Sequence, residues 1–260
     1  MNAMSTVTEQ NVWLARPKAN ANSRLRLFCF PYAGGGALAF RGWAAALPAW
    51  VEVCPVRLPG REGRIREAAL TRVKAVAEAA AEALLPSLGA PFALFGHSMG
   101  AFVAFELARL LRRRGGPRPV RLFASGCRAP HIPRKRPTTY DRPEAEFLDE
   151  LRRLNGTPRE VLDDPELMRV MLPLLRADFE ASETYEYTPE APLDCPVTAF
   201  GGQDDPEAAR ADVRAWCEHT TAPFTLKVFP GDHFFLHAAQ GAVLGALSGQ
   251  LEQDARAGAF

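Results

Sequence analysis

The stretch that decides the fold is LFGHSMGAF, residues 94–102. It places Ser98 between Gly96 and Gly100 in the pattern G-x-S-x-G, directly after the apolar run Pro91–Phe95. Apolar residues at helical spacing follow over Met99–Arg114, so the order is strand, turn and helix. Because glycine has no Cβ, the chain can reverse sharply here and present the serine hydroxyl at the start of the helix. The stretch therefore predicts an elbow that exposes a nucleophilic serine.

Short apolar runs that predict strands continue on both sides of this elbow. Helical patterns separate them, at Thr71–Leu85, Met99–Arg114, Glu207–Glu218 and Ala238–Gln253. This alternation predicts an α/β fold with a mostly parallel central sheet and helices on both faces. The predicted strands are Arg24–Phe30, Val51–Val56, Pro91–Phe95, Val120–Ser125, Pro196–Phe200 and Phe224–Phe229.

The interval between Ser125 and Pro196 breaks the alternation. It contains no convincing strand and is too long for a bare loop in a compact domain. Glu144–Leu154 is amphipathic, and Glu166–Glu180 is apolar over much of its circumference. We therefore expect a helical insertion at about residues 128–192. Two interpretations are open: helices packed on the sheet edge, or a lid whose inner face lines a chamber for an apolar substrate.

Composition excludes several classes of protein. The 31 basic and 30 acidic residues give a net charge of +1, so no global field favours nucleic acid or an anionic membrane. No apolar run is long enough to span a bilayer. Cysteines are few, odd in number and scattered, which is typical of a reduced, cytoplasmic protein without a cysteine-bound metal. We expect no cofactor. The five cysteines are Cys29, Cys54, Cys127, Cys195 and Cys217.

The first 23 residues differ in character from the rest of the chain. Residues 1–23 lack the apolar core of a secretory signal and predict a flexible N-terminal tail. Residues 24–260 are enough for one α/β domain that carries the insertion.

A serine needs a base to become a nucleophile, and the histidines supply candidates. His233 lies in FPGDHFFL, after the last predicted strand, where the order Ser, Asp or Glu, His requires the base. His97 adjoins Ser98, but strand alternation aims its ring away from the hydroxyl. We expect His219 to be solvated. His237 and His233 have the spacing of a metal pair, but no third ligand is near, so we expect no metal.

The orienting acid is expected at the end of the strand before His233. FGGQDDP, residues 200–206, offers Asp204 and Asp205 there. Asp205 precedes Pro206, a residue suited to the first turn of a helix. We assign Asp205 as the acid that holds the imidazole in the correct tautomer, with Asp204 as the alternative.

A glycine-rich loop, FPYAGGGA at residues 30–37, follows the first predicted strand. No G-K-[ST] follows it and no G-x-G-x-x-G is present, which argues against a phosphate loop. Acyl transfer needs backbone N–H groups that stabilise a developing oxyanion. The predicted donors are the N–H groups of Ala33 and Met99.

Five motifs in register, PYAGGGA, RLPGRE, GHSMGA, GGQDDP and GDHFFL, closely resemble the type II thioesterases that accompany polyketide and non-ribosomal peptide synthases. The likeness runs from Arg24 to about Leu251. It implies an α/β-hydrolase fold and a serine thioesterase that hydrolyses acyl thioesters on the phosphopantetheine arms of carrier proteins, removing aberrant or stalled acyl groups. By position, the resemblance assigns Ser98, Asp205 and His233 to the triad, Ala33 and Met99 to the oxyanion hole, and the insertion to a mobile lid.

The resemblance also implies a partner, an acyl carrier protein or peptidyl carrier domain that bears phosphopantetheine. We expect a monomer, no nucleic acid and no membrane. An acidic carrier surface would favour basic residues at the mouth of the site, although surface charges are more often merely solvated. The candidates are Arg61, Arg64 and Arg66, or Arg134, Lys135 and Arg136.

Three other functions remain open from the sequence. The triad chemistry would also suit a medium-chain fatty acyl thioesterase, since related animal enzymes release such acids. It would equally suit a small-ester carboxylesterase, because the same residues cleave either kind of bond. A non-catalytic acyl-binding module on a hydrolase scaffold is the third, and the presence of both Asp205 and His233 argues against it.

Overall fold

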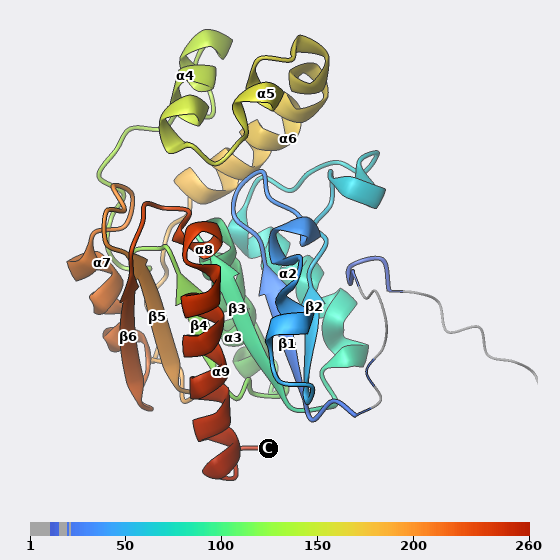
Figure 1. The fold of residues 1–260 in the computed structure, drawn as a ribbon, viewed down its shortest axis with the longest axis vertical. Coiled ribbons are helices and arrows are strands. Elements are labelled where there is room, and N and C mark those ends of the chain that lie inside the picture. The colour runs from blue at the N-terminus through green and yellow to red at the C-terminus, as the bar shows by residue number, and fades with distance from the viewer. Residues whose placement is uncertain (1–10, 16–19, 21) are drawn as a thin grey trace, which may run out of the picture.

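One parallel sheet organises the molecule (Figure 1). The computed structural model describes residues 11–15, 20 and 22–260. Six strands run in the order β2-β1-β3-β4-β5-β6, and every neighbouring pair is parallel. The predicted strands and fold class are confirmed, and each strand end lies within two residues of its predicted position. The strands are β1 (Leu25–Phe30), β2 (Val51–Pro55), β3 (Phe92–His97), β4 (Leu122–Ser125), β5 (Val197–Gly202) and β6 (Phe224–Phe229).

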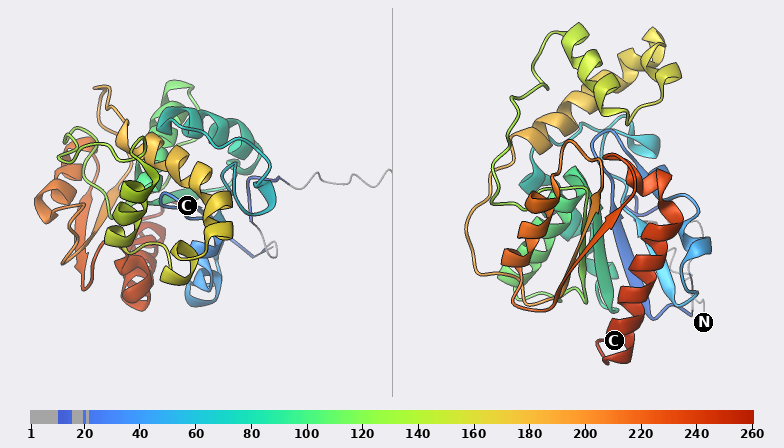
Figure 2. Two further views of the ribbon diagram at one scale, coloured as in Figure 1. Left: turned by 90° about the horizontal axis from the view of Figure 1, so that it is seen from above. Right: turned by 60° about the vertical axis from the view of Figure 1, so that its left-hand side comes forward.

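Alternation along the strands builds a separate core on each face of the sheet. Phe28 and Phe30 of β1 pack into one core, whereas Leu27 and Cys29 pack into the other. Helices cover both faces, as the views in Figures 1 and 2 show. The first core is shared with α2 (Val73–Leu84) and α3 (Met99–Arg113), and the second with α1 (Trp43–Ala46), α8 (Phe235–Ala238) and α9 (Gln240–Arg256).

The segment between β4 and β5 is helical, as predicted, and we call it the insertion. Its helices are α4 (Glu144–Leu154), α5 (Arg159–Leu162) and α6 (Pro165–Glu183), which lie beyond one end of the sheet (Figures 1 and 2). Apolar side chains of these helices form a small core of their own, made of Phe147, Leu151, Leu162, Met168, Leu172 and Leu175. The insertion therefore has internal packing that does not depend on the sheet.

The single helix predicted over Glu207–Glu218 is wrong in its first part. The chain stays irregular through Ala209, and then forms α7 (Arg210–Arg214) and a 3₁₀ helix, η4 (Ala215–His219). Asp205 Oδ1 accepts the N–H groups of Glu207 and Ala208 and closes a turn at the start of this segment. The remaining 3₁₀ helices are η1 (Ala37–Phe40), η2 (Glu62–Arg64) and η3 (Leu85–Ser87).

The expected flexible tail differs from the structure at residues 11–15. Trp13 and Leu14 are buried, and Leu14 forms an antiparallel bridge with Val56 beside β2. The guanidinium of Arg64 lies 4.3 Å from the ring centroid of Trp13. The adjacent apolar residues Trp13 and Leu14, in an otherwise polar segment, are the sequence signal that could have predicted this packing. The rest of the expected tail, residues 1–10, 16–19 and 21, lies outside the described residues.

All five cysteines are free, and four of them are buried. Burial raises the pKa of the Cys127 thiol to about 12, so this thiol stays protonated at neutral pH. Within the part of the chain that the structure describes, no helix is both long enough and apolar enough to cross a membrane.

Candidate active site

The elbow at Ser98 has the tight geometry that its glycines predict. Ser98 has φ +53°, a backbone conformation that non-glycine residues rarely adopt. A Cβ on Gly96 would lie 2.0 Å from the carbonyl oxygen of Gly100, and a Cβ on Gly100 would lie 2.2 Å from the carbonyl oxygen of Phe30. Only glycine fits at either position. The close approach holds the start of α3, which Ser98 directly precedes, against the end of β1.

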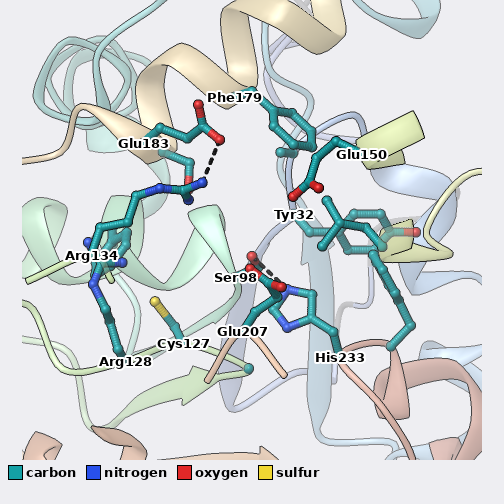
Figure 3. Close-up of a pocket in the computed structure, with 16 residues that line it drawn as sticks. Tyr32, Ser98, Cys127, Arg128, Arg134, Glu150, Phe179, Glu183, Glu207 and His233 are labelled. Carbon is teal, nitrogen blue, oxygen red and sulfur yellow. Dashed lines mark hydrogen bonds and ion pairs between the residues drawn. The ribbon is translucent and has the colours of Figure 1, made fainter. Parts of the chain in front are cut away.

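The structure brings Ser98, His233 and Asp205 into one hydrogen-bonded chain. His233 Nε2 lies 3.0 Å from Ser98 Oγ, and its Nδ1 lies 2.9 Å from Asp205 Oδ2. Figure 3 marks the contact between Ser98 and His233 with a dashed line. Asp205 and His233 are buried, whereas Ser98 is half-buried and borders a cavity. A carboxylate that accepts from Nδ1–H leaves Nε2 free to accept the serine proton. The arrangement has the geometry of a nucleophile with its general base.

The structure distinguishes clearly between the two candidate aspartates. Asp205 contacts the imidazole and also accepts two backbone N–H groups, which fix its carboxylate. The side chain of Asp204 is exposed, and its backbone N–H donates to the carbonyl of Gly231. Of the two, Asp205 is therefore the one that orients His233.

One predicted oxyanion donor, Met99, lies in the elbow, and the other, Ala33, lies in the glycine-rich loop after β1. The N–H of Met99 is the first of α3, where a helix leaves its N–H groups without intrahelical partners. Ala33 borders the same cavity as Ser98, in a turn closed by the N–H of Gly35 and the carbonyl of Tyr32 at 2.9 Å. Among the described residues, neither N–H donates to a protein acceptor. Both are available for a substrate oxygen.

His97 has a structural role that the sequence did not reveal. Its ring is fully buried and points away from Ser98, as predicted, toward the oxygen of Ser125 and the carbonyl of His233. Both contacts are 2.9 Å. Burial holds the pKa of His97 well below its usual range, so the ring is neutral. Because a carbonyl only accepts, Nε2–H of His97 donates to the carbonyl of His233, and Nδ1 accepts from the hydroxyl of Ser125. These contacts fix the backbone at His233.

The other histidines do not form a metal site. His219, which we expected in solvent, is buried, with Nε2 2.7 Å from Nδ1 of His131. Burial, with the nearby His131 as a further cause, lowers the pKa of His219 to about 4. His237 contacts the hydroxyl of Tyr32 at 3.0 Å rather than turning toward His233. The described residues contain no group of three or more candidate ligands arranged around a metal position.

A cavity of about 100 Å³ opens at Ser98 and His233. The insertion supplies part of its wall, including Glu150 of α4 and Phe179 of α6 (Figure 3). This favours the interpretation that the inner face of the insertion lines a substrate chamber. The insertion also contributes the charged side chains of Arg128 and Arg134, whereas Phe102 of α3 lies on the side of the body.

The structure contradicts two of the predicted docking residues. Arg61 is buried and pairs with Asp178 of α6, and Arg64 is buried and pairs with Glu67. Sequence position near a loop suggested exposure, but Arg61 turns inward to a buried carboxylate, and Arg64 lies against the ring of Trp13 while it pairs with an exposed one. Arg66 remains exposed.

The second basic group lies at the surface beside the cavity, and its charges are paired. Arg134 pairs with Glu183 on α6 (Figure 3), Lys135 with Asp212, and Arg136 with Glu207. These pairs leave the group less net positive than the sequence suggests. Lys135 and Arg136 are exposed, so their side chains remain accessible to a partner.

The parallel sheet, the serine elbow and the helical insertion between β4 and β5 define an α/β hydrolase. The model of the thioesterase domain family matches residues 25–251, and the chain belongs to this family.

Similar proteins come from biosynthetic pathways. The chain is 44% identical to the gramicidin S biosynthesis protein GrsT of Aneurinibacillus migulanus, over 95% of this chain and 97% of that protein. Among solved structures, the RedJ thioesterase of the prodiginine pathway in Streptomyces coelicolor has a TM-score of 0.82 and 40% identity, covering 95% of this chain and 96% of RedJ. The type II thioesterase BorB of the borrelidin cluster has a TM-score of 0.84 and 39% identity, covering 92% and 97%.

Proposed function

We propose that this protein is a type II editing thioesterase of polyketide or non-ribosomal peptide biosynthesis. It hydrolyses acyl thioesters on the phosphopantetheine arms of carrier proteins and so removes aberrant or stalled acyl groups. The observation that carries the proposal is the chain of contacts from Ser98 through His233 to Asp205 at a cavity, in a chain of the thioesterase family. Relatives named for gramicidin S and borrelidin biosynthesis support the pathway class.

The first half of the proposed reaction transfers the acyl group to the protein. Ser98 Oγ attacks the thioester carbonyl carbon while His233 Nε2 takes the hydroxyl proton. The carbonyl oxygen becomes an oxyanion, which the N–H groups of Ala33 and Met99 stabilise. The C–S bond then breaks, its electron pair goes to sulfur, and the imidazolium returns the proton to the departing thiolate. Thiols ionise near pH 8.5, so this leaving group departs more readily than an alkoxide.

The second half releases the acid. A water molecule attacks the acyl-serine carbonyl while His233 takes one of its protons, and the C–O bond to Ser98 breaks as His233 returns that proton to Oγ. The same two N–H groups stabilise the second oxyanion. Asp205 stays ionised throughout and stabilises the imidazolium in both halves.

The size of the cavity favours short acyl groups. The cavity of about 100 Å³ lies between the triad and the insertion, and it is small beside the roughly 300–1,000 Å³ of typical ligand pockets. A medium-chain acyl group requires the insertion to move, whereas an acetyl or propionyl group fits with little displacement. We infer that the insertion acts as a lid, and that the enzyme works as a cytoplasmic monomer whose partner is a phosphopantetheine-bearing carrier.

A panel of matched substrates tests the proposal. Acetyl, butyryl, octanoyl and dodecanoyl groups are presented on a carrier protein and on N-acetylcysteamine, and the same acids are presented as oxygen esters of matched alcohols. We expect the highest kcat/KM for short acyl groups on the carrier. A peak at octanoyl or dodecanoyl would support a medium-chain fatty acyl thioesterase instead. A preference for the oxygen esters would support a carboxylesterase.

Covalent labelling tests the remaining alternative. A fluorophosphonate probe labels a serine that a base has activated, so we expect labelling of the wild type and none of Ser98→Ala. Absence of labelling in the wild type would support a non-catalytic acyl-binding module.

A further inference from the structure

An ion pair buried between the insertion and the body of the protein joins Asp178 of α6 to Arg61, which follows β2. Arg61 Nη2 lies 2.8 Å from Asp178 Oδ1, and Nη1 lies 2.9 Å from Oδ2. The two side chains are only 5% and 2% exposed. This bidentate geometry is the strongest form of an arginine–carboxylate contact, and burial protects it from screening by salt.

The same two side chains also hold the glycine-rich loop. Asp178 Oδ2 accepts the N–H of Gly34 at 2.7 Å, and Arg61 Nη1 donates to the carbonyl of Gly35 at 2.7 Å. Within the loop, the N–H of Gly35 donates to the carbonyl of Tyr32. The Tyr32–Ala33 peptide is planar and trans, so fixing that carbonyl also fixes the opposite direction of the Ala33 N–H.

Shape adds to these polar contacts. A Cβ on Gly34 would lie 2.5 Å from Cδ2 of Leu175, one helical turn from Asp178 on α6. Gly34 also has φ +77°, which favours glycine. The loop and α6 therefore fit each other closely, and a displacement of α6 removes both the packing and the carboxylate.

We propose that Asp178 is a positioning residue that ties the oxyanion loop to the insertion, so that the Ala33 N–H is aimed at the reacting carbonyl only while α6 rests on the body. This inference depends on the proposed function, because it takes Ala33 as an oxyanion donor. Movement of α6 away from the body admits the substrate and loosens the loop. Its return assembles the oxyanion hole around the bound thioester and couples hydrolysis to closure.

The primary test compares two variants of α6. Asp178→Asn keeps the shape but removes the charge and turns an amide N–H₂ toward Arg61. We expect kcat to fall about 100-fold with KM within about threefold of wild type, since losing one oxyanion donor costs about 10²–10³ in rate. The control is Glu180→Gln, which removes the exposed pair between α6 and Arg72 and touches no residue of the loop. It should retain kcat within about twofold.

A transition-state analogue separates a positioning role from a merely structural one. An acyl trifluoromethyl ketone forms a hemiketal with Ser98 whose oxyanion needs the loop, whereas the corresponding thioether binds without one. In Asp178→Asn we expect ketone affinity to fall about as much as kcat/KM and thioether affinity to stay unchanged. Circular dichroism and thermal unfolding verify that each variant is folded.

Two results would overturn the proposal: an Asp178→Asn variant no slower than Glu180→Gln, or a slower one whose ketone affinity equals that of the wild type. If Asp178→Asn does not fold, Arg61→Lys replaces it, because lysine keeps the charge but cannot reproduce the two-nitrogen bidentate contact with Asp178. There we expect about a tenfold fall in kcat with a parallel fall in ketone affinity, and unchanged values for both would overturn the proposal.

The assay also separates this inference from the proposed function. All rates are measured with an activated ester, p-nitrophenyl acetate, alongside an acetyl-carrier thioester. A wild type that turns over the ester but not the carrier thioester contradicts the proposed substrate class and leaves the comparison of variants intact.

Discussion

The elbow and the insertion form two halves of one cavity, but they are held by different forces. At the elbow, backbone lies against backbone, with glycines where a Cβ would approach a carbonyl oxygen within 2.2 Å. The insertion has a small apolar core of its own and meets the body partly through ion pairs, including Asp178 with Arg61, Glu180 with Arg72 and Arg153 with Glu207, beside the packing of Leu175 on Gly34.

This difference assigns different tasks to the two regions. A nucleophile and its base must stay within a few tenths of an ångström of their positions, and packed backbone provides that rigidity. A lid must move without unfolding, which suits a segment with a separate core and polar attachments. Substitutions at the elbow should therefore change the chemical step or the stability of the fold. Substitutions in the insertion should change substrate access and kcat/KM while the fold stays stable.

The largest effect on activity is expected at Asp205, and the neighbouring Asp204 provides the control. Asp205→Asn should lower kcat about 10⁴-fold, because an amide at this position favours the wrong tautomer of His233. Asp204→Asn should stay within about twofold of wild type, because its side chain is exposed. Steady-state kinetics on an acetyl thioester measure both. Equal losses in the two variants would show that the orienting acid is wrongly assigned.

One added methyl group should lower the stability of the fold at the elbow but lower the activity in the insertion. Gly100→Ala places a Cβ 2.2 Å from a backbone carbonyl and should destabilise the fold by about 3 kcal/mol or more. Gly156→Ala places a Cβ 2.1 Å from the ring of Phe234, next to His233, and should obstruct closure of the insertion. We expect kcat/KM to fall about tenfold there, as a modest geometric displacement does.

Urea unfolding and kinetics on the same samples check this pair. The free energy of unfolding of Gly156→Ala should stay within about 1 kcal/mol of wild type, because the far end of an aromatic ring can shift more cheaply than backbone. Global destabilisation of Gly156→Ala equal to that of Gly100→Ala would contradict the distinction between the two regions.

Salt should act on the insertion more than on the sheet. The pairs Glu180 with Arg72 and Arg153 with Glu207 are partly exposed, and each contributes at most about 1 kcal/mol at low ionic strength. Raising NaCl from about 0.05 M to about 1 M shortens the screening length severalfold. We expect proteolytic cleavage within residues 128–192 to accelerate about threefold while the midpoint of global unfolding stays nearly constant. Cleavage rates independent of salt would show that apolar contacts hold the insertion.

The smallest effect concerns His219, in the body and remote from the reacting atoms. Its pKa is about 4 in the folded protein and about 6.5 when unfolded, so the unfolded chain binds the proton first as pH falls. The stability of the folded state is therefore complete above about pH 6.5 and declines toward about pH 4.

A matched variant isolates this contribution. His219→Gln keeps a polar partner for His131 but does not titrate, so its stability should vary less between pH 7 and pH 4, by about 1–2 kcal/mol. Urea unfolding across that range measures the difference. Parallel profiles for the two proteins would exclude His219 as the group responsible.

The elbow could be predicted from sequence because its signals are local. Gly96, Ser98 and Gly100 lie within five residues, and a short, largely apolar run predicts each strand. Asp205 and His233 followed from the order in which strand ends meet at one edge of a parallel sheet. Two helices of the insertion, α4 and α6, also followed from periodicity, since their apolar stripes face a core, whereas the short α5 was not predicted.

What the sequence could not supply were contacts between distant segments. Arg61 seemed a surface charge until the structure placed Asp178, 117 residues away, against it. His219 seemed solvated because its neighbours are polar, yet the rings of Phe105 and Trp216 enclose it. The helix expected from Glu207 begins only at Arg210, after a turn in which the carboxylate of Asp205 accepts the N–H groups of Glu207 and Ala208.

The most direct test of the central claim is detection of the acyl-enzyme. The protein is mixed with acetyl-carrier protein, quenched with acid within a single turnover, and examined by intact and peptide mass spectrometry. We predict one acetyl group on Ser98, formed and lost at rates consistent with kcat, and none in Ser98→Ala, whose turnover should be at least about 10⁴-fold slower. Undiminished turnover in Ser98→Ala, with no acyl group on the protein, would contradict the account.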